Sequence, residues 1–215
     1  MSATLLSVNV GRPKVRDWAG IGRTSIDKRP VAGPVAARTL GLDGDQVSDV
    51  EHHGGVDQAV YAFAREDLDT WAERLGMPIP DGRFGENLTT TGIDVNEAEV
   101  GERWEIGSAE FEVASIRTPC NDFKNWMGLG GYDNHAWVKR FTVEGRPGPY
   151  LRVVREGVVE AGDEIRVVHR PGHGVTVSTM FAALTTRREL LPELLRVEGL
   201  VTKARQRAEQ YVAHA

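Results

Sequence analysis

The sequence predicts a mainly β protein of the α+β class, with a small barrel or curled mixed sheet followed by a helical C-terminal extension. Short apolar segments separated by glycine recur over the first three quarters of the chain, a pattern typical of small barrels. One of them alternates apolar and charged residues as a β-hairpin does. After PGHG at 171–174 the composition shifts to Ala, Leu, Arg and Glu, which indicates helices.

The N-terminal third predicts three strands. Residues 4–10 are a short apolar segment, and a connection rich in Gly, Pro and Arg leads to a second strand near Thr24–Ile26. Ala59–Phe63 is a compact, partly aromatic segment bounded by charged residues, which is typical of a buried strand.

A helix is predicted directly after the third strand. Leu68, Trp71, Ala72 and Leu75 recur at helical spacing, and Gly76 is a suitable C-terminal stop. Two prolines follow shortly afterwards, so the helix is expected to end there.

The clearest β signal surrounds Gly107. Trp104 and Ile106 alternate with charged residues before it, and Phe111 and Val113 alternate after it. The pattern predicts a hairpin with one buried face. Two further strands are expected, at Tyr150–Arg155 and Glu164–His169.

Three helices are expected from about residue 175 onward. Their candidate N-caps are Thr176 or Ser178, Thr186, and Thr202. Pro192 is tolerable only within a first turn. The predicted domains are therefore a β domain over 1–173, with its core at about 26–168, and a helical extension over 174–215.

Composition and charge argue against several classes of protein. The chain has 26 basic and 31 acidic residues, a formal net charge of -5, which disfavours a non-specific nucleic-acid binder. No stretch approaches the roughly 18 apolar residues of a membrane span, and the N-terminus lacks the apolar core of a secretory signal. The single cysteine excludes an internal disulfide framework and suits a reducing compartment. We expect a soluble cytoplasmic protein that binds neither nucleic acid nor membrane.

Cys120, the only thiol, follows the predicted hairpin in the segment IRTPC. Pro119 restricts the backbone beside it, and Arg117 places a cation nearby, which favours a thiolate. A thiolate is what both a soft metal and an electrophilic sulfur require. The alternative from the sequence is a small buried hydrophobic residue.

The segment EHHGGVDQAV admits two interpretations. Adjacent histidines seldom chelate one ion, because successive side chains of an extended segment point to opposite faces. The segment is either a turn built on Gly54 and Gly55, or a backbone nest in which N–H groups and His53 hold an anion. Asp57 could orient this loop by accepting hydrogen bonds from nearby amides.

Three other segments carry candidate ligand contacts. RFGENL is a turn whose Glu86 and Asn87 either cap it or face a ligand. Lys28 and Arg29 offer cations, with a solvated basic pair as the alternative. The glycine-dense segment Gly128–His135 matches no phosphate-binding motif and is either a plain loop or a mobile lid.

Four motifs occur in one order with close spacing: GLDGD at Gly41–Asp45, HHGGVDQAV at His52–Val60, FGENL at Phe84–Leu88 and RTPC at Arg117–Cys120. This series resembles the MOSC family, named for the C-terminal domain of molybdenum-cofactor sulfurase, and within it the stand-alone YiiM-like branch. The helical tail resembles the C-terminal extension of that branch. The resemblance implies a β-barrel-like fold, in agreement with the strand pattern.

The resemblance also implies oxidoreductase chemistry. Characterised relatives bind a molybdopterin-type molybdenum cofactor and reduce N-hydroxylated compounds such as hydroxylaminopurines and amidoximes. Cys120 would be the catalytic residue and the protein ligand of molybdenum. A separate reductase or small electron carrier would supply electrons, because the chain shows no flavin, haem or iron–sulfur motif. A monomer and a homodimer are both compatible with the sequence.

The family motifs assign further roles position by position. The residues expected at the cofactor are Lys28, His53, Gly54, Gly55, Phe84, Gly85, Glu86, Asn87, Arg117 and Thr118. The residues expected to support them are Asp45, Asp57 and Pro119. The segment SDVEH before His53 is acidic where some relatives are basic, which lowers the negative cofactor charge that this loop could neutralise.

Two other functions are compatible with the same residues. A persulfide on Cys120 would make the protein a sulfur carrier. A module that binds a phosphorylated pterin or similar anion without catalysis would use the same cations. Persulfide formation without molybdenum would favour the first alternative, and tight cofactor binding without turnover would favour the second.

Overall fold

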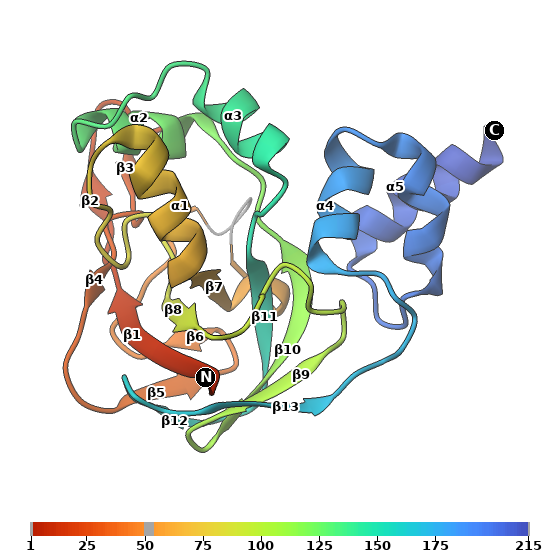
Figure 1. Cartoon of the computed structure of the whole chain (residues 1–215), viewed down its shortest axis with the longest axis horizontal. Coiled ribbons are helices and arrows are strands. Elements are labelled where there is room, and N and C mark those ends of the chain that lie inside the picture. The colour runs from red at the N-terminus through yellow and green to blue at the C-terminus, as the bar shows by residue number, and fades with distance from the viewer. Residues whose placement is uncertain (1, 50–53, 215) are drawn as a thin grey trace.

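One eight-stranded sheet forms the centre of the structure, a computed structural model that describes residues 2–49 and 54–214. Its strands follow the order β13-β9-β10-β11-β7-β8-β1-β4 (Figure 1). β7 and β8 run parallel, and the other neighbours run antiparallel. The strands are β1 (Thr4–Val10), β4 (Arg29–Pro30), β7 (Val60–Ala64), β8 (Leu88–Thr91), β9 (Arg103–Ile106), β10 (Ala109–Ile116), β11 (Pro149–Arg155) and β13 (Ile165–His169).

The sheet curls until β1, which lies next to the edge strand β4, meets the beginning of β13 at the other edge. The backbone N–H of Leu5 donates to the carbonyl oxygen of Asp163 at 2.9 Å, and that of Gly162 donates to Leu5 at 2.7 Å. The N–H of Ile165 donates to Ala3 at 2.9 Å. These bonds join β1 to the beginning of β13, so the predicted α+β fold with a barrel-like sheet is confirmed.

Two smaller sheets flank this one. One has the order β12-β5-β6 and the other pairs β2 with β3. Their strands are β2 (Lys14–Val15), β3 (Arg23–Thr24), β5 (Val35–Arg38), β6 (Gly41–Leu42) and β12 (Gly157–Val159). The strand predicted at Thr24–Ile26 is thus displaced: β3 ends at Thr24 and belongs to a short separate hairpin.

The β9–β10 hairpin was predicted correctly. Trp104, Ile106 and Phe111 are fully buried, and the charged residues between them are partly exposed. A register shift between Val113 and Ser115 interrupts the alternation near the end of β10. The shift is a β-bulge, which bends the strand and supports curling of the sheet.

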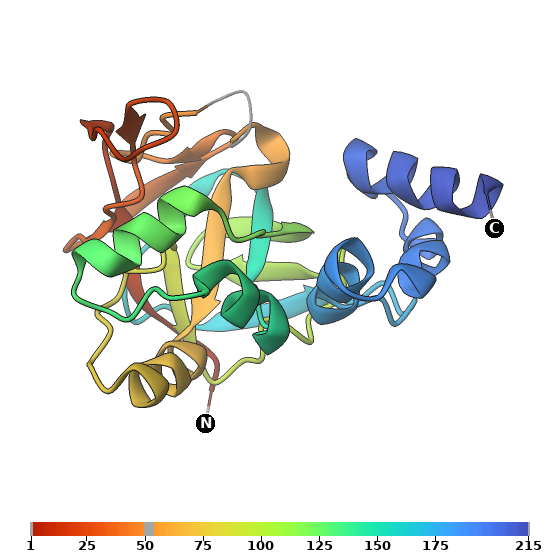
Figure 2. The same ribbon diagram turned by 90° about the horizontal axis from the view of Figure 1, so that it is seen from above.

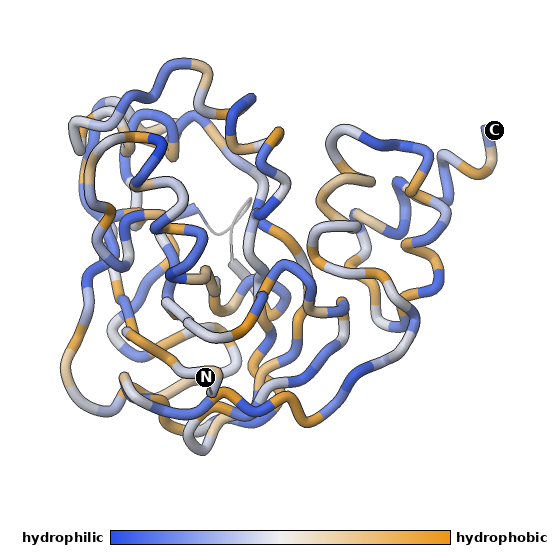
Figure 3. Tube along the Cα trace, viewed as in Figure 1, coloured by the Kyte–Doolittle hydropathy of each residue, from blue (hydrophilic) through white to orange (hydrophobic). Residues whose placement is uncertain are grey.

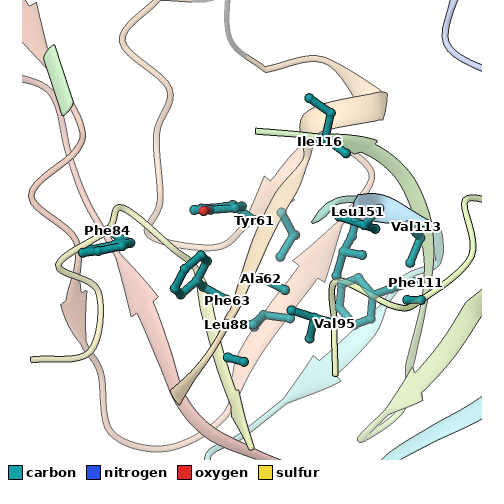
Figure 4. Close-up of a cluster of buried hydrophobic side chains, with 14 of the residues drawn as sticks. Tyr61, Ala62, Phe63, Phe84, Leu88, Val95, Phe111, Val113, Ile116 and Leu151 are labelled. Carbon is teal, nitrogen blue, oxygen red and sulfur yellow. The ribbon is translucent and has the colours of Figure 1, made fainter. Parts of the chain in front are cut away.

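The interior of the curled sheet is filled by side chains of β7, β8, β10 and β11 (Figure 4). All five residues of β7 are buried, because the strand is covered on both faces. Figure 3 shows hydrophobic residues concentrated along these central strands. Strand β8, over Leu88–Thr91, was not predicted by the sequence analysis.

Three helices lie together beside the sheet (Figure 1). They are α1 (Arg65–Leu75), α2 (Asn121–Leu129) and α3 (Trp137–Glu144). The stop predicted at Gly76 is confirmed: its φ is 66° and its N–H bonds to carbonyl groups of α1. Trp71 and Phe123 contact Trp137 with ring centroids 4.8 and 5.2 Å apart, so an aromatic cluster joins these helices.

The glycine-dense segment Gly128–His135 connects α2 to α3. Its Tyr132 hydroxyl donates to the carbonyl of Pro78 at 2.8 Å, and Asn134 donates to that of Lys124 at 3.0 Å. These bonds tie the segment to two other parts of the fold. It is therefore a fixed connection, and the lid interpretation is not supported.

The C-terminal extension contains α4 (Val177–Thr185), the 3-10 helix η2 (Arg188–Arg196) and α5 (Thr202–Ala213). Figure 2 shows it projecting to one side of the sheet domain. The Thr176 side chain caps α4 by accepting from the N–H of Thr179 at 3.2 Å, as predicted. Among the described residues no helix is long and apolar enough to cross a membrane.

The caps predicted at Thr186 and Thr202 were wrong. Thr186 ends α4 instead of starting a helix, and Val201 precedes α5 without a side-chain cap. The middle helix contains Pro192 and is a 3-10 helix. Pro192 is the fifth residue of this helix and not in its first turn, and it has no N–H to donate.

The hairpin turn offers a test of the fold. A Cβ on Gly107 (φ 58°) would lie 2.3 Å from the carbonyl oxygen of Val158. We expect Gly107→Ala to lower the free energy of unfolding by about 3 kcal/mol, because a backbone clash adds to left-handed strain. Gly172→Ala is the matched control, since Gly172 has φ 79° and nothing within 4 Å; it should lose only about 1 kcal/mol. Equal losses in urea unfolding would contradict the described packing.

Candidate functional site

A cavity of about 520 Å³ opens where the chain passes from β10 to α2. Segments far apart in the sequence meet around it, and they include the β2–β3 hairpin, the loop before η1 (Val56–Gln58), the start of β8 and the start of α2. The predicted site residues that line it are Lys28, Asp45, Gly54, Gly85, Asn87, Arg117, Thr118 and Cys120.

The remaining predicted residues are placed differently. Gly55, Phe84, Glu86, Asp57 and Pro119 do not line the cavity. His53 lies outside the described residues, so its predicted role rests on the sequence.

Cys120 is the residue immediately before α2, with φ -130° and ψ 171°. It is partly buried, and its carbonyl oxygen accepts from the N–H of Lys124 at 3.1 Å. The helix thereby holds the cysteine backbone, and the positive end of the helix dipole lies beside it. Because Cys120 is partly exposed at a cavity, it is not simply a small buried hydrophobic residue.

Arg117 lies in the wall of the cavity with only 7% of its surface exposed. Its guanidinium donates to the carbonyl oxygen of Phe84 and lies over the rings of Phe123 and Tyr61, 4.0 and 5.0 Å from their centroids. Within the described part of the chain, no carboxylate forms an ion pair with it. A buried cation without a counter-charge is costly unless an anion approaches it.

Burial by itself would lower the pKa of Arg117. The neighbouring Tyr61, Tyr150 and Cys120 side chains outweigh this effect, and the pKa is raised. The guanidinium is therefore a permanent positive charge that faces the same cavity as the only thiol.

Lys28 and Asp45 form a close pair in the cavity wall. The Lys28 Nζ lies 2.5 Å from both carboxylate oxygens of Asp45. Burial lowers the pKa of Lys28, and the attraction of Asp45 opposes that shift. The carboxylate also accepts from the N–H of Gly11 at 2.7 Å, so the pair is fixed and adds little net charge to the cavity.

Asn87 connects this ion pair to the sheet. Its side-chain amide donates to Asp45 at 3.0 Å and to the carbonyl of Asn9 at 3.1 Å, and its side-chain oxygen accepts from the N–H of Tyr61 at 3.1 Å. Its backbone exchanges further hydrogen bonds with the same two residues. The asparagine of FGENL therefore joins β1, β7 and the cavity wall.

Phe84 and Glu86 lie behind the cavity, which corrects the prediction that they line it. Phe84 packs in the aromatic cluster, with its ring centroid 5.0 Å from that of Phe123. Its contribution to the site is its carbonyl group, which accepts from Arg117. Glu86 is fully buried and accepts from the N–H of Gly82 at 2.5 Å and from Thr89 at 3.1 Å. Residues of one turn alternate in direction, so Gly85 and Asn87 reach the cavity while their neighbours do not.

Asp57 does not line the cavity and contributes to the fold. Within the described residues it pairs with Arg152 at 2.6 Å and accepts from no loop amide. Arg152 also bonds to Glu112 at 2.6 Å and to the carbonyl of Gly199 at 3.0 Å. The aspartate thus belongs to a network that ties β10 and β11 to the C-terminal extension.

The loop before η1 has the backbone of a turn. Gly54 and Gly55 have φ values of 101° and 78°, which favour glycine. The N–H of Gly54 donates to the side chain of Gln58 at 3.2 Å. That N–H is therefore occupied, which favours the turn interpretation over a nest at this residue.

Several cavity residues were missed by the sequence analysis. They include Gly20, Ile21, Arg23 and Thr24 of the N-terminal hairpin, and Tyr61 and Tyr150 from two adjacent strands. The tyrosines lie in apolar strands, where nothing local separates a core residue from one in a cavity wall. Ile21, exposed between glycines and basic residues, was a signal that could have been noticed.

Among the described residues, no cluster of three or more His, Cys, Asp or Glu side chains could hold a metal ion. The cavity provides one thiol and two cations without a carboxylate partner among the described residues, the buried Arg117 and the exposed Arg23.

Glu86 makes stability depend on pH. Burial raises its pKa from 4.5 to about 7, so the folded protein keeps this proton at pH values where the unfolded chain has lost it. Stability should therefore fall as pH rises from about 4.5 to 7, by about 3 kcal/mol from this group. Glu86→Gln should remove that part of the slope in urea unfolding. Parallel curves for wild type and variant would contradict the assignment, and exposed Glu160→Gln is the control.

Residues 49–166 match the MOSC domain family model. YflK of Bacillus subtilis (strain 168) is 30% identical over 175 residues, which cover 81% of this chain and 77% of YflK. A Gibberella moniliformis protein named Reductase is 30% identical over 175 residues, or 78% of this chain but only 29% of that longer protein.

The fold is also similar to a solved structure. The crystal structure of YiiM from Geobacillus stearothermophilus matches with a TM-score of 0.79 and 27% identity, over 98% of this chain and 99% of that one. The match includes the helical extension. With more than half of the chain matched by the family model, and with these relatives, the chain belongs to the MOSC-domain family and resembles its YiiM proteins.

Proposed function

We propose that this protein is an oxidoreductase that uses a molybdopterin-type molybdenum cofactor to reduce N-hydroxylated compounds in the cytoplasm. One observation carries the proposal: the only thiol and a buried arginine without a carboxylate partner in the described chain line one cavity. Membership of the MOSC family and similarity to a protein named Reductase support the reaction class.

The residues present fit such a cofactor. A volume of about 520 Å³ is within the range of cofactor and ligand sites, roughly 300–1,000 Å³. A cysteine thiolate is a soft ligand suited to a metal that dithiolene sulfurs also bind. Arg117 would offset the negative charge of the cofactor. Lys28 is already neutralised by Asp45 and would mainly help to position the cofactor.

When bound, the cofactor would supply the two-electron reduction of an N–O bond. The chain would contribute binding and orientation. Cys120 would hold the metal from the start of α2, and Asn87 would keep the Lys28–Asp45 wall in place. The aromatic rings that contact Arg117 would keep water away from its charge, which strengthens its attraction for an anion.

Cys120→Ser tests the metal ligand. The protein should be produced in cells that make molybdenum cofactor, and molybdenum and pterin should be measured beside activity with a hydroxylaminopurine or an amidoxime. We expect near-stoichiometric molybdenum in the wild type, and in the variant a changed metal site and an activity loss of at least about 10²-fold, with an unchanged melting temperature.

Full activity of Cys120→Ser would contradict the proposal. Absence of molybdenum from both proteins, together with a stable persulfide after treatment with a cysteine desulfurase, would favour the sulfur carrier instead. Bound cofactor without turnover would favour the non-catalytic binding module.

Arg117→Met tests the role of the buried cation, with Arg83→Met as the matched control. Both arginines donate to a backbone carbonyl and stack on an aromatic ring, at 4.0 Å for Arg117 and 3.9 Å for Arg83. Arg117 lines the cavity and Arg83 does not. Both variants should lose stability, but only Arg117→Met should retain about tenfold less cofactor per folded protein. Equal retention by the two variants would contradict the role.

A further inference from the structure

Residues 11–29, here called the basic arm, differ in charge from the rest of the chain. They contain six basic and two acidic residues, whereas the whole chain has a net charge of -5. The arm includes the β2–β3 hairpin, which stands apart from the main sheet at the end of the molecule opposite to α5 (Figures 1 and 2). The arm is therefore a basic segment of an acidic protein. The negative charge is carried by residues 30–173, because the C-terminal extension over 174–215 has six basic and four acidic residues.

The charges of the arm are largely unneutralised. Arg12, Arg16 and Arg23 are exposed and form no ion pair with any described residue. Lys14 and Arg29 share the single carboxylate of Asp27, at 2.6 Å each. The arm thus presents an excess of positive charge to solvent.

The arm also exposes apolar side chains among these cations. Val15 is 78% and Ile21 47% exposed. Apolar groups beside arginines are typical of protein-binding surfaces, where charge steers the approach and apolar contacts stabilise the complex. A hairpin that served only to cover the cavity would not need Val15 in solvent.

The arm lies directly beside the cavity. Gly20 and Ile21 line it together with Cys120. The N–H of Gly20 donates to Asp122 at 3.0 Å, and Asn125 donates to the carbonyl of Trp18 at 3.2 Å. Both bonds connect the arm to α2, the helix that begins after Cys120, so a partner bound on the arm would be close to the thiol.

We propose that the basic arm is the docking surface for an acidic electron-donor protein. This inference rests on the proposed function. Reduction of one N–OH group to N–H and water consumes two electrons and two protons; the donor supplies the electrons and water supplies the protons. Because electron transfer weakens steeply with distance, the donor must bind next to the cavity. Residues 30–173, which are net negative, would repel it, and this disfavours binding over the rest of the sheet domain.

A nucleic acid is the other polyanion that a basic surface can bind. The arm carries two acidic residues beside its six basic ones. Its most exposed apolar residues, Val15 and Ile21, are aliphatic, and its one aromatic residue, Trp18, is only partly exposed. Single strands are usually bound by aromatic stacking. A protein partner is therefore the better match.

The test compares two charge reversals of equal size. Arg12→Glu with Arg16→Glu alters the arm without touching the cavity lining, and Lys203→Glu with Arg207→Glu alters exposed residues of α5 at the opposite end. The probe is flavodoxin, a small acidic electron carrier. Its affinity should be measured by titration calorimetry at about 20 mM and about 500 mM salt, with melting temperatures as the folding control.

We expect the arm variant to bind flavodoxin at least about tenfold more weakly than wild type at low salt, and the difference to vanish at high salt. The α5 variant should bind like wild type. No binding by wild type, equal affinities for all three proteins, or a loss confined to the α5 variant would overturn the proposal. Tighter arm-dependent binding of a short RNA than of flavodoxin would also overturn it.

A second readout separates this inference from the proposed function. With dithionite as the reductant, the cofactor-loaded arm variant should turn over N-hydroxylated substrate at the wild-type rate, while its flavodoxin-driven rate should fall about tenfold. An equal fall with dithionite would overturn the docking role. If no protein turns over with dithionite, the proposed function fails, and the binding measurement still decides whether the arm is a docking surface.

Discussion

The buried side chain of Asn87 is the junction on which the site depends. It bonds to backbone groups of β1 and β7 and to the carboxylate of Asp45. Buried amides stabilise a fold only when their hydrogen-bonding groups are satisfied, and here the partners belong to three separate segments. One residue therefore couples the pairing of two strands to the position of the ion pair in the cavity wall.

Besides the exposed Arg23, the cavity is lined by two less exposed cations, Lys28 and Arg117, whose surroundings differ. Lys28 is matched by a carboxylate at 2.5 Å, whereas Arg117 has a carbonyl group and aromatic rings as partners. The Lys28–Asp45 pair has no net charge, whereas Arg117 keeps an unneutralised positive charge in a partly desolvated part of the cavity wall. The site is thus prepared for one anionic group near Cys120 without being strongly basic as a whole.

The arm and the cavity are separated from the C-terminal extension along the length of the molecule (Figure 2). The positive arm and the cavity share one end, and the C-terminal extension forms the other (Figure 2). The extension is joined to the sheet domain through the Arg152 network and through α4, and none of its residues lines the cavity. Cys120 and the basic arm therefore lie together, and the helices of the C-terminal extension take no part in this site.

The sequence alone determined the elements that local rules govern. Alternation predicted the β9–β10 hairpin, helical spacing and Gly76 predicted α1, and the order of motifs indicated the family that the comparisons confirmed. Local rules did not reveal which residues of the FGENL turn reach the cavity, where Phe84 and Glu86 point away from it. They also did not reveal that Tyr61 and Tyr150, in two strands, line it. Those directions depend on strands and helices that meet only when the sheet curls. The tertiary structure therefore decided the composition of the site, because its contacts join residues far apart in the chain.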